Sequence, residues 1–254
     1  LRRASVGSSQ LLLIHFNMKK IVIIVLIFGC SYLTFCQENI NKVQYVYRVK
    51  NDFISKDLIE KEKNNGLKGN LELINNSLIN YQNKMSFSLT FNKFESMYSM
   101  NKMLNLDFDR QMVFAMAITK AKDIVYTDLK NRITLKKVKT LGEEFNVKTN
   151  LDSIKWELTQ EEKTIGGYRC FKAVTKSIFK KDLIIEAWYS PNIPFGFGPL
   201  GYGGLPGLIL ELTENKITFF AKEIKINLNE KFNFEFKEKN KYISQKKLDS
   251  LIAS

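Results

Sequence analysis

Apolar and polar residues alternate along much of this 254-residue chain, and this period of two limits its fold more than any other feature. Successive side chains of a β-strand point to opposite faces of a sheet, so the alternation indicates strands with one buried and one solvated face. The alternating runs are rich in Val, Ile, Phe, Tyr and Thr, which fit a pleated surface. They cover residues 43–49, 84–91, 132–139, 168–175, 183–189 and 216–226.

Short turn signals separate these runs, at Lys63–Gly66 (KNNG), at Asn75–Asn76 and at Ile165–Tyr168 (IGGY). Short connections favour antiparallel neighbours. Helical spacing occurs in two places, over residues 52–63 and 244–254. Because ten or more strands cannot stay in one flat sheet, the sheet has to curl. We predict an all-β (or β-rich α+β) fold: a single curled antiparallel sheet, forming a half-barrel or open barrel, with one or two short helices.

The N-terminal region has the layout of a secretory signal peptide. Met18 is followed by two lysines, by an apolar run from Ile21 to Phe28, and by a short polar stretch that ends at Cys36. The apolar run is too short to span a bilayer. We expect residues 18–36 to be removed after Cys36; the alternative is a lipoprotein that is cut before Cys30.

The domain organisation follows from this cleavage. Residues 1–17 precede the first methionine, and we expect them to be translated upstream sequence without a role in the mature protein. Residues 37–254 are then a single antiparallel β domain without a transmembrane span. The expected location is the periplasm or the cell surface.

Histidine and cysteine are almost absent from the predicted mature chain. The single histidine, His15, lies upstream of the signal peptide, which excludes Ser-His-Asp and Cys-His hydrolases and histidine-ligated metal sites. After cleavage at Cys36, Cys170 is the one remaining thiol. Since it lies in an alternating run, we expect a buried small hydrophobe rather than a reactive cysteine. We expect no metal and no cofactor.

The charge of the chain does not indicate nucleic-acid binding. Four basic residues lie before Gln37, so the mature chain keeps 35 basic and 26 acidic residues. Among the basic residues only four are arginines, the residue type that reads bases and phosphates with two parallel hydrogen bonds. The charges are also spread along the sequence instead of forming a basic run. We therefore expect no nucleic-acid partner.

Glycine and proline are concentrated in one segment. All four prolines and six of the 13 glycines fall between Pro191 and Gly207, directly before an apolar run. Proline interrupts a sheet ladder and glycine permits close backbone approach, so the chain leaves the sheet here. Two interpretations remain open: a plug that fills the open end of the sheet, or the rim of a binding site. The candidate contact residues are Trp188, Tyr189, Phe195, Phe197, Tyr202, Leu205, Pro206 and Leu208.

The string Gly204–Ile209 reads GLPGLI, and with its surroundings the chain resembles the GLPGLI family of exported bacterial proteins. The matching neighbours are Trp156, Lys163, Ile165, Gly167, Tyr168, Cys170, Lys172, Ala173, Trp188, Tyr189, Ile193, Pro194, Gly198 and Pro199. The resemblance implies export from Bacteroidetes-type bacteria and carries no settled activity. The layout is also similar to that of half-barrel proteins that carry lipoproteins across the periplasm, which suggests a fold more than a function.

These observations favour a non-enzymatic envelope protein. We expect it to hold an apolar small molecule, a lipid or an acylated partner in the curled sheet. The alternative is an accessory protein that acts through contacts with another envelope protein. A large empty apolar cavity would favour the carrier, and a filled core with an exposed GLPGLI loop would favour a protein partner.

A hydrolase that uses paired carboxylates is the third interpretation. Its candidates are Glu161 with Glu162, Glu186, and Asp107 with Asp109. Because neighbouring side chains on a strand face opposite sides, we expect Glu161 and Glu162 not to share one site.

Overall fold

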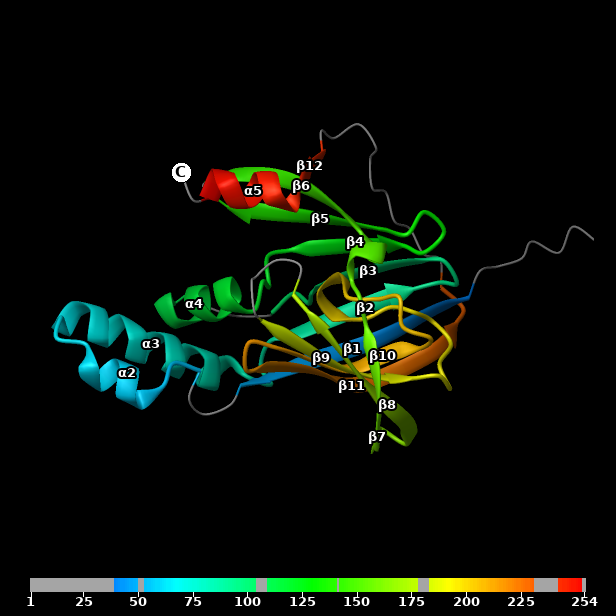
Figure 1. Ribbon diagram of the computed structural model, residues 1–254, viewed down its shortest axis with the longest axis horizontal. Helices are drawn as coiled ribbons and strands as arrows, with labels where there is room; N and C mark the ends of the chain where they lie inside the picture. The colour runs from blue at the N-terminus through cyan, green and yellow to red at the C-terminus, as the bar shows by residue number, and fades with distance from the viewer. Residues whose placement is uncertain are drawn as a thin grey trace, which may run out of the picture. The chain divides into compact units, whose positions relative to one another are not determined.

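Twelve strands form one open sheet in the order β12-β6-β5-β4-β3-β2-β1-β11-β10-β9-β8-β7 (Figure 1). This computed structural model describes residues 39–49, 53–103, 109–140, 142–177, 183–230 and 242–252; the predicted signal peptide and upstream segment lie outside these ranges. The strands are β1 (Ile40–Val49), β2 (Ser86–Phe91), β3 (Glu95–Met100), β4 (Ile124–Asp128), β5 (Ile133–Thr140), β6 (Glu143–Asn150), β7 (Glu157–Ile165), β8 (Tyr168–Lys176), β9 (Ile184–Ser190), β10 (Leu208–Glu214), β11 (Ile217–Leu228) and β12 (Tyr242–Ser244).

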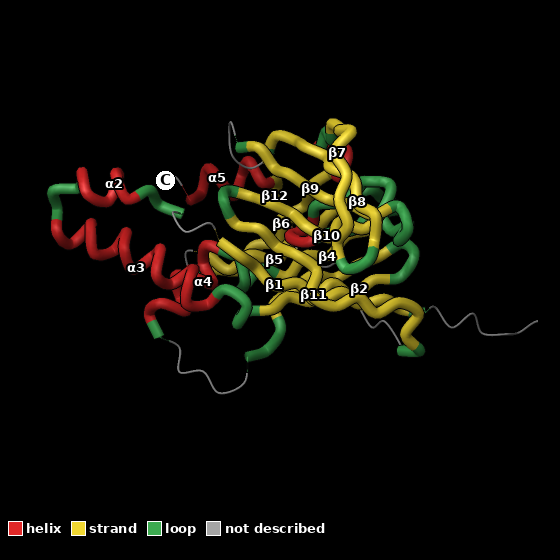
Figure 2. The backbone as a smooth tube through the Cα atoms, turned by 90° about the horizontal axis from the view of Figure 1, so that it is seen from below, coloured by secondary structure: helices red, strands yellow, loops and turns green. Residues whose placement is uncertain are grey.

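The predicted fold class is confirmed. Every neighbouring pair of strands is antiparallel except β12 with β6, which is parallel. All six alternating runs of the sequence lie in strands. Strand β1 pairs with β11 near the middle of the sheet, which brings together two segments from opposite ends of the chain (Figure 2). The sheet ends at β12 and β7, so it does not close.

Four α-helices occur in the described part of the chain, more than the one or two predicted. They are α2 (Lys56–Lys61), α3 (Asn65–Tyr81), α4 (Arg110–Ile118) and α5 (Gln245–Ile252), together with two short 3₁₀ turns, η1 (Leu151–Ser153) and η2 (Pro199–Gly201). Helices α2 and α5 lie within the two segments with helical spacing. Helix α2 packs on α3, and α3 packs on α4 and β1 (Figure 1).

The predicted turn at Asn75–Asn76 is wrong, because both residues lie inside α3. The Asn75 side chain accepts a hydrogen bond from the main-chain N–H of Ile54 and donates one to its carbonyl, each at 2.9 Å. The asparagine therefore ties the segment before α2 to the helix. The turn residues at 63–66 instead begin α3, where Asn64 caps the helix by accepting from the N–H of Leu67 at 3.1 Å.

Aromatic side chains fill the inner face of the sheet, which is the face that carries the core. The Phe87 and Tyr98 rings stack at 5.6 Å, and Phe219 meets Phe87 edge-on at 5.5 Å. Tyr45 and Tyr47 lie on the same face of β1 and are completely buried. Burial of such large side chains is the dominant favourable term in folding.

Residues 191–207, which we call the cover segment, lie against this inner face. Phe195 and Phe197 both pack on Phe91 of β2, at 5.2 and 5.6 Å between ring centroids. In the middle of the segment, η2 contacts β3 and β4. The Tyr45 hydroxyl donates a 2.6 Å hydrogen bond to the carbonyl of Ile209, directly after the segment. The chain thus covers the inside of its own sheet.

Glycine is required in the cover segment for close backbone contact. A Cβ atom on Gly203 would lie 2.6 Å from the carbonyl oxygen of Gly196, and one on Gly207 would lie 2.2 Å from that of Ser190. The N–H of Gly204 donates to the same Gly196 carbonyl at 2.9 Å. The glycine cluster seen in the sequence is therefore explained by packing.

We expect Gly203→Ala to lower the free energy of unfolding by about 3 kcal/mol, since the added methyl group clashes with fixed backbone. Gly69→Ala is the matched control. Gly69 lies in α3 with nothing within 4 Å of the added Cβ, so alanine should stabilise the protein by about 1 kcal/mol. Denaturant unfolding measures both values. Equal stability of Gly203→Ala and the parent would show that the segment is not tightly packed.

Candidate functional site

Most of the predicted contact residues are buried in the core. Five of them are at most 5% exposed, namely Tyr189, Phe197, Tyr202, Leu205 and Leu208. Two others are half-buried, Trp188 and Phe195, and Pro206 is exposed. The cover segment therefore has the geometry of the plug interpretation. Contact of these residues with a ligand stays a prediction.

Trp156 and Tyr202 tie the cover segment to the start of β7. The Trp156 indole N–H donates a 2.9 Å hydrogen bond to the carbonyl of Gly203, and its ring lies 6.2 Å from that of Tyr202. Trp188 is not part of this packing. It alternates along β9 with the buried Ala187 and Tyr189, so it lies on the opposite, outer face.

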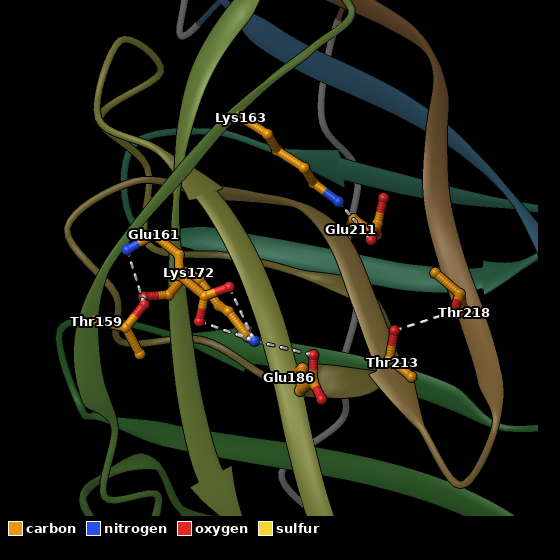
Figure 3. Close-up of polar contacts among 8 residues, drawn as sticks. All are labelled: Thr159, Glu161, Lys163, Lys172, Glu186, Glu211, Thr213 and Thr218. Carbon is orange, nitrogen blue, oxygen red and sulfur yellow. Dashed lines mark hydrogen bonds and ion pairs between the residues drawn. The ribbon is translucent and has the colours of Figure 1, made fainter.

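The outer face carries a group of paired charges, which we call the outer-face polar cluster (Figure 3). Its members surround Trp188, which the figure does not draw. The Lys163 ammonium lies 4.2 Å from the centroid of the Trp188 ring and 2.7 Å from Glu211 Oε1. Lys172 lies between two carboxylates, 3.0 Å from Glu161 Oε1 and 3.6 Å from Glu186 Oε2. The cluster also contains two hydroxyl groups, those of Thr213 and Thr218, at 2.9 Å.

The carboxylates of this cluster are held by lysines. The hydrogen bond that Lys172 donates to Glu161 raises the pKa of Lys172 above its ordinary value, so the lysine stays charged at neutral pH. As predicted, Glu161 and Glu162 face different partners: Glu162 pairs with Arg169 at 2.5 Å, on the other side of the strand. The two neighbouring carboxylates therefore do not share one site, and the hydrolase interpretation stays a hypothesis.

The remaining carboxylate candidates are the two aspartates near α4. Asp109 is the N-cap of α4, where it accepts a 2.6 Å hydrogen bond from the N–H of Met112 and another from the Tyr81 hydroxyl at 3.0 Å. Its position is explained by helix capping. Asp107 lies outside the described residues.

Two cavities of about 210 Å³ or more in the described part of the chain have apolar side chains in their lining, whereas one of about 240 Å³ is lined by polar side chains alone. One, of about 520 Å³, is a groove between α2 and α3. Its lining is Lys56, Ile59, Glu60, Lys68, Glu72, Asn75, Asn76 and Ile79. The other, of about 210 Å³, lies on the inner face between the end of α4, η2 and the β10–β11 hairpin; we call it the inner cavity. The sequence could not indicate either one, because α3 and α4 were not predicted.

A partly buried ion pair lies at the inner cavity. Lys120 Nζ is 2.7 Å from Glu214 Oε2, and the Glu214 side chain is 10% exposed while that of Lys120 is 35% exposed. The Tyr202 hydroxyl lies 3.4 Å from the other oxygen of the same carboxylate. Burial raises the pKa of Tyr202, and the charge of Glu214 raises it further, so this phenol is a hydrogen-bond donor at physiological pH. In the described part of the chain, no group of three metal-ligating side chains could hold a metal ion.

Comparison with known proteins finds a similar fold and a match of part of the chain to a family of unknown function. A family model described as a protein of unknown function (Porph_ging) matches residues 175–211, which include the cover segment. No curated protein matches the chain. In structure, the chain is similar to PNGF-II in its C2 and P2₁ crystal forms, with a TM-score of 0.52 for each and sequence identities of 17% and 16%.

The likeness to PNGF-II covers 85% of this chain but 33% of the PNGF-II chain, so this protein spans about a third of its length. At this level of identity the likeness shows the fold alone. No helix in the described ranges has the length and apolar character needed to cross a membrane.

We expect Leu205→Asp to destabilise the protein by about 3 kcal/mol or more, because Leu205 is 4% exposed and a buried carboxylate would have no partner there. Pro206→Asp is the control, since it places the same side chain at an exposed neighbouring position and should change stability by less than about 1 kcal/mol. Melting temperatures measure both. If Leu205→Asp has the same melting temperature as the parent, the plug interpretation is wrong.

We expect Cys170 to be unreactive at neutral pH. Its side chain is buried, as predicted, and burial raises the pKa of the thiol to about 11. At pH 8 only about one thiol in a thousand is then the reactive thiolate. Labelling of residues 37–254 with a disulfide reagent should be slow in the native protein and fast in denaturant. Equally fast labelling in both states would contradict the burial.

Proposed function

We propose that this chain is a non-enzymatic protein of the bacterial cell envelope, a member of the GLPGLI family, that acts through contacts with other proteins. Export by the predicted signal peptide of residues 18–36 is part of this proposal. The Porph_ging match at residues 175–211 is compatible with it, because the match includes the GLPGLI string.

The filled inner face of the sheet is the observation that carries the proposal. In the described part of the chain, the cover segment occupies the space that a lipid carrier would need. The inner cavity has about 210 Å³, which is room for about seven non-hydrogen atoms at roughly 30 Å³ each and too little for the acyl chain of a lipid. An acyl chain held in the curled sheet is therefore the weaker candidate. Of the two features expected for a protein partner, the described residues have the filled core but not an exposed GLPGLI loop, because Leu205, Leu208 and Ile209 are buried. A contact surface for a protein partner therefore has to lie elsewhere on the chain.

The helical layer of α2, α3 and α4 is the surface that we expect to make these contacts. Four large apolar side chains are exposed there, and they are Leu58, Leu67, Ile79 and Val113. They are more than half of the seven exposed large apolar residues in the described ranges. Exposed apolar residues next to a groove of about 520 Å³ are typical of a protein-binding surface.

Photo-crosslinking in the organism that makes the protein tests this assignment. A photoreactive residue at Ile79 should give a discrete crosslinked species with another protein. The same residue at Ile124 is the control, because both isoleucines are 37% exposed and Ile124 lies at the start of β4. We expect at least a tenfold stronger crosslink at Ile79.

Two outcomes would contradict the proposal. The first is equal crosslinking at Ile79 and Ile124. The second comes from native mass spectrometry of the protein recovered without detergent: an added mass of lipid size that is lost on denaturation would instead support the carrier.

A further inference from the structure

The inner cavity combines apolar walls with one polar end. Five apolar side chains line it: Ile118, Leu183, Leu200, Ile217 and Phe219. The polar end is formed by Lys120 and Glu214, with Thr119 and Asn215 beside them. A concave apolar site with a few convergent polar groups is the usual form of a small-molecule site.

The ion pair at this cavity contains a nearly buried carboxylate. The Glu214 side chain is 10% exposed and the Lys120 side chain is 35% exposed, so the carboxylate loses most of its water while the ammonium group keeps part of its own. Lys120 and Glu214 nevertheless meet at 2.7 Å across 94 residues of sequence, on the inner face of an otherwise apolar strand end. A role in recognising a ligand explains why the pair is placed there.

Three residues that line the cavity have a positive φ angle. One of them, Asn215 with φ 49°, lies in the tight turn between β10 and β11, where this conformation is common. The other two are Lys120 and Leu200. Lys120 has φ 56° at the position after the C-cap of α4, where glycine is usual. Leu200 has φ 58° inside η2. Non-glycine residues in this conformation are uncommon and cluster at functional sites. At both positions glycine would relieve the strain, and at both the side chain lines the cavity instead.

The size and polarity of the cavity define the ligand. A volume of about 210 Å³ corresponds to about seven non-hydrogen atoms, taking roughly 30 Å³ for each water-sized group. Lys120 can donate a hydrogen bond and Glu214 can accept one. Lys120 and Glu214 already neutralise each other at 2.7 Å, so a ligand with a charged head group would have to break this pair or leave its own charge without a partner. An uncharged group that both donates and accepts suits the pair best.

We propose that the inner cavity binds a small uncharged amphiphile, a primary alcohol or amide on a short apolar body, with its head group beside the Lys120–Glu214 pair. This inference goes beyond the protein contacts proposed for α2, α3 and α4. The two sites share no lining residue.

Methyl NMR with three ligands of equal chain length tests this site. The ligands are hexan-1-ol, hexylammonium and hexanoate, and the observed signals are the isoleucine methyl groups. Hexan-1-ol should shift the signals of Ile118 and Ile217 in a saturable manner. The Ile79 signal, in the groove between α2 and α3, should not move. Both charged ligands should bind at least about tenfold more weakly.

The double variant Lys120→Met with Glu214→Met removes the polar end while keeping an apolar cavity. It should bind hexan-1-ol about tenfold more weakly than the parent. If the variant does not fold, titration of the three ligands on the unchanged protein still tests the proposal.

The proposal is overturned if hexan-1-ol gives no saturable shift at Ile118 and Ile217 up to about 10 mM. It is also overturned if Ile79 shifts equally or if a charged ligand binds as well. None of these results depends on crosslinking at Ile79, so failure of this site and failure of the proposed protein contacts are distinguishable.

Discussion

An open sheet with an aromatic inner face has to be covered, and this requirement organises the whole domain. The covering is done by backbone more than by side chains. Residues 191–207 come close enough that Gly203 and Gly207 leave no space for a Cβ atom. The Tyr45 hydroxyl donates a hydrogen bond to the carbonyl of Ile209, so neither of these two buried polar groups is left without a partner. The core is thus closed by the segment that connects two strands of the same sheet, β9 and β10.

This closure decides which surfaces can take part in function. Since the inner face is occupied, the aromatic residues of the cover segment contribute stability, and the residues open to a partner lie elsewhere. The outer-face polar cluster around Trp188 is internally paired, so its charges are already satisfied. The helical layer and the inner cavity are the places where apolar surface, space and polar groups occur together.

The sheet could be predicted from the sequence because alternation is a local property of a strand. The position of the cover segment could also be predicted, since glycine and proline have few other uses at that density. Helix α3 could not, because its asparagines have weak helix propensity and the helix is held by tertiary contacts such as those of Asn75 with Ile54. The Lys120–Glu214 pair forms because the end of α4 meets the end of β10. No local sequence pattern predicts such a contact.

The open edge of the sheet at β7 has a further consequence wherever the protein is concentrated. An unpaired edge strand offers free backbone groups to any other extended chain, including a second copy of the same protein. Four charged side chains lie along β7, and they are Glu157, Glu161, Glu162 and Lys163. A strand that pairs there would have to desolvate these charges and displace their partners on β8 and β10. The ionic contacts at this edge therefore act as a barrier to polymerisation, which allows a long sheet to remain open without growing.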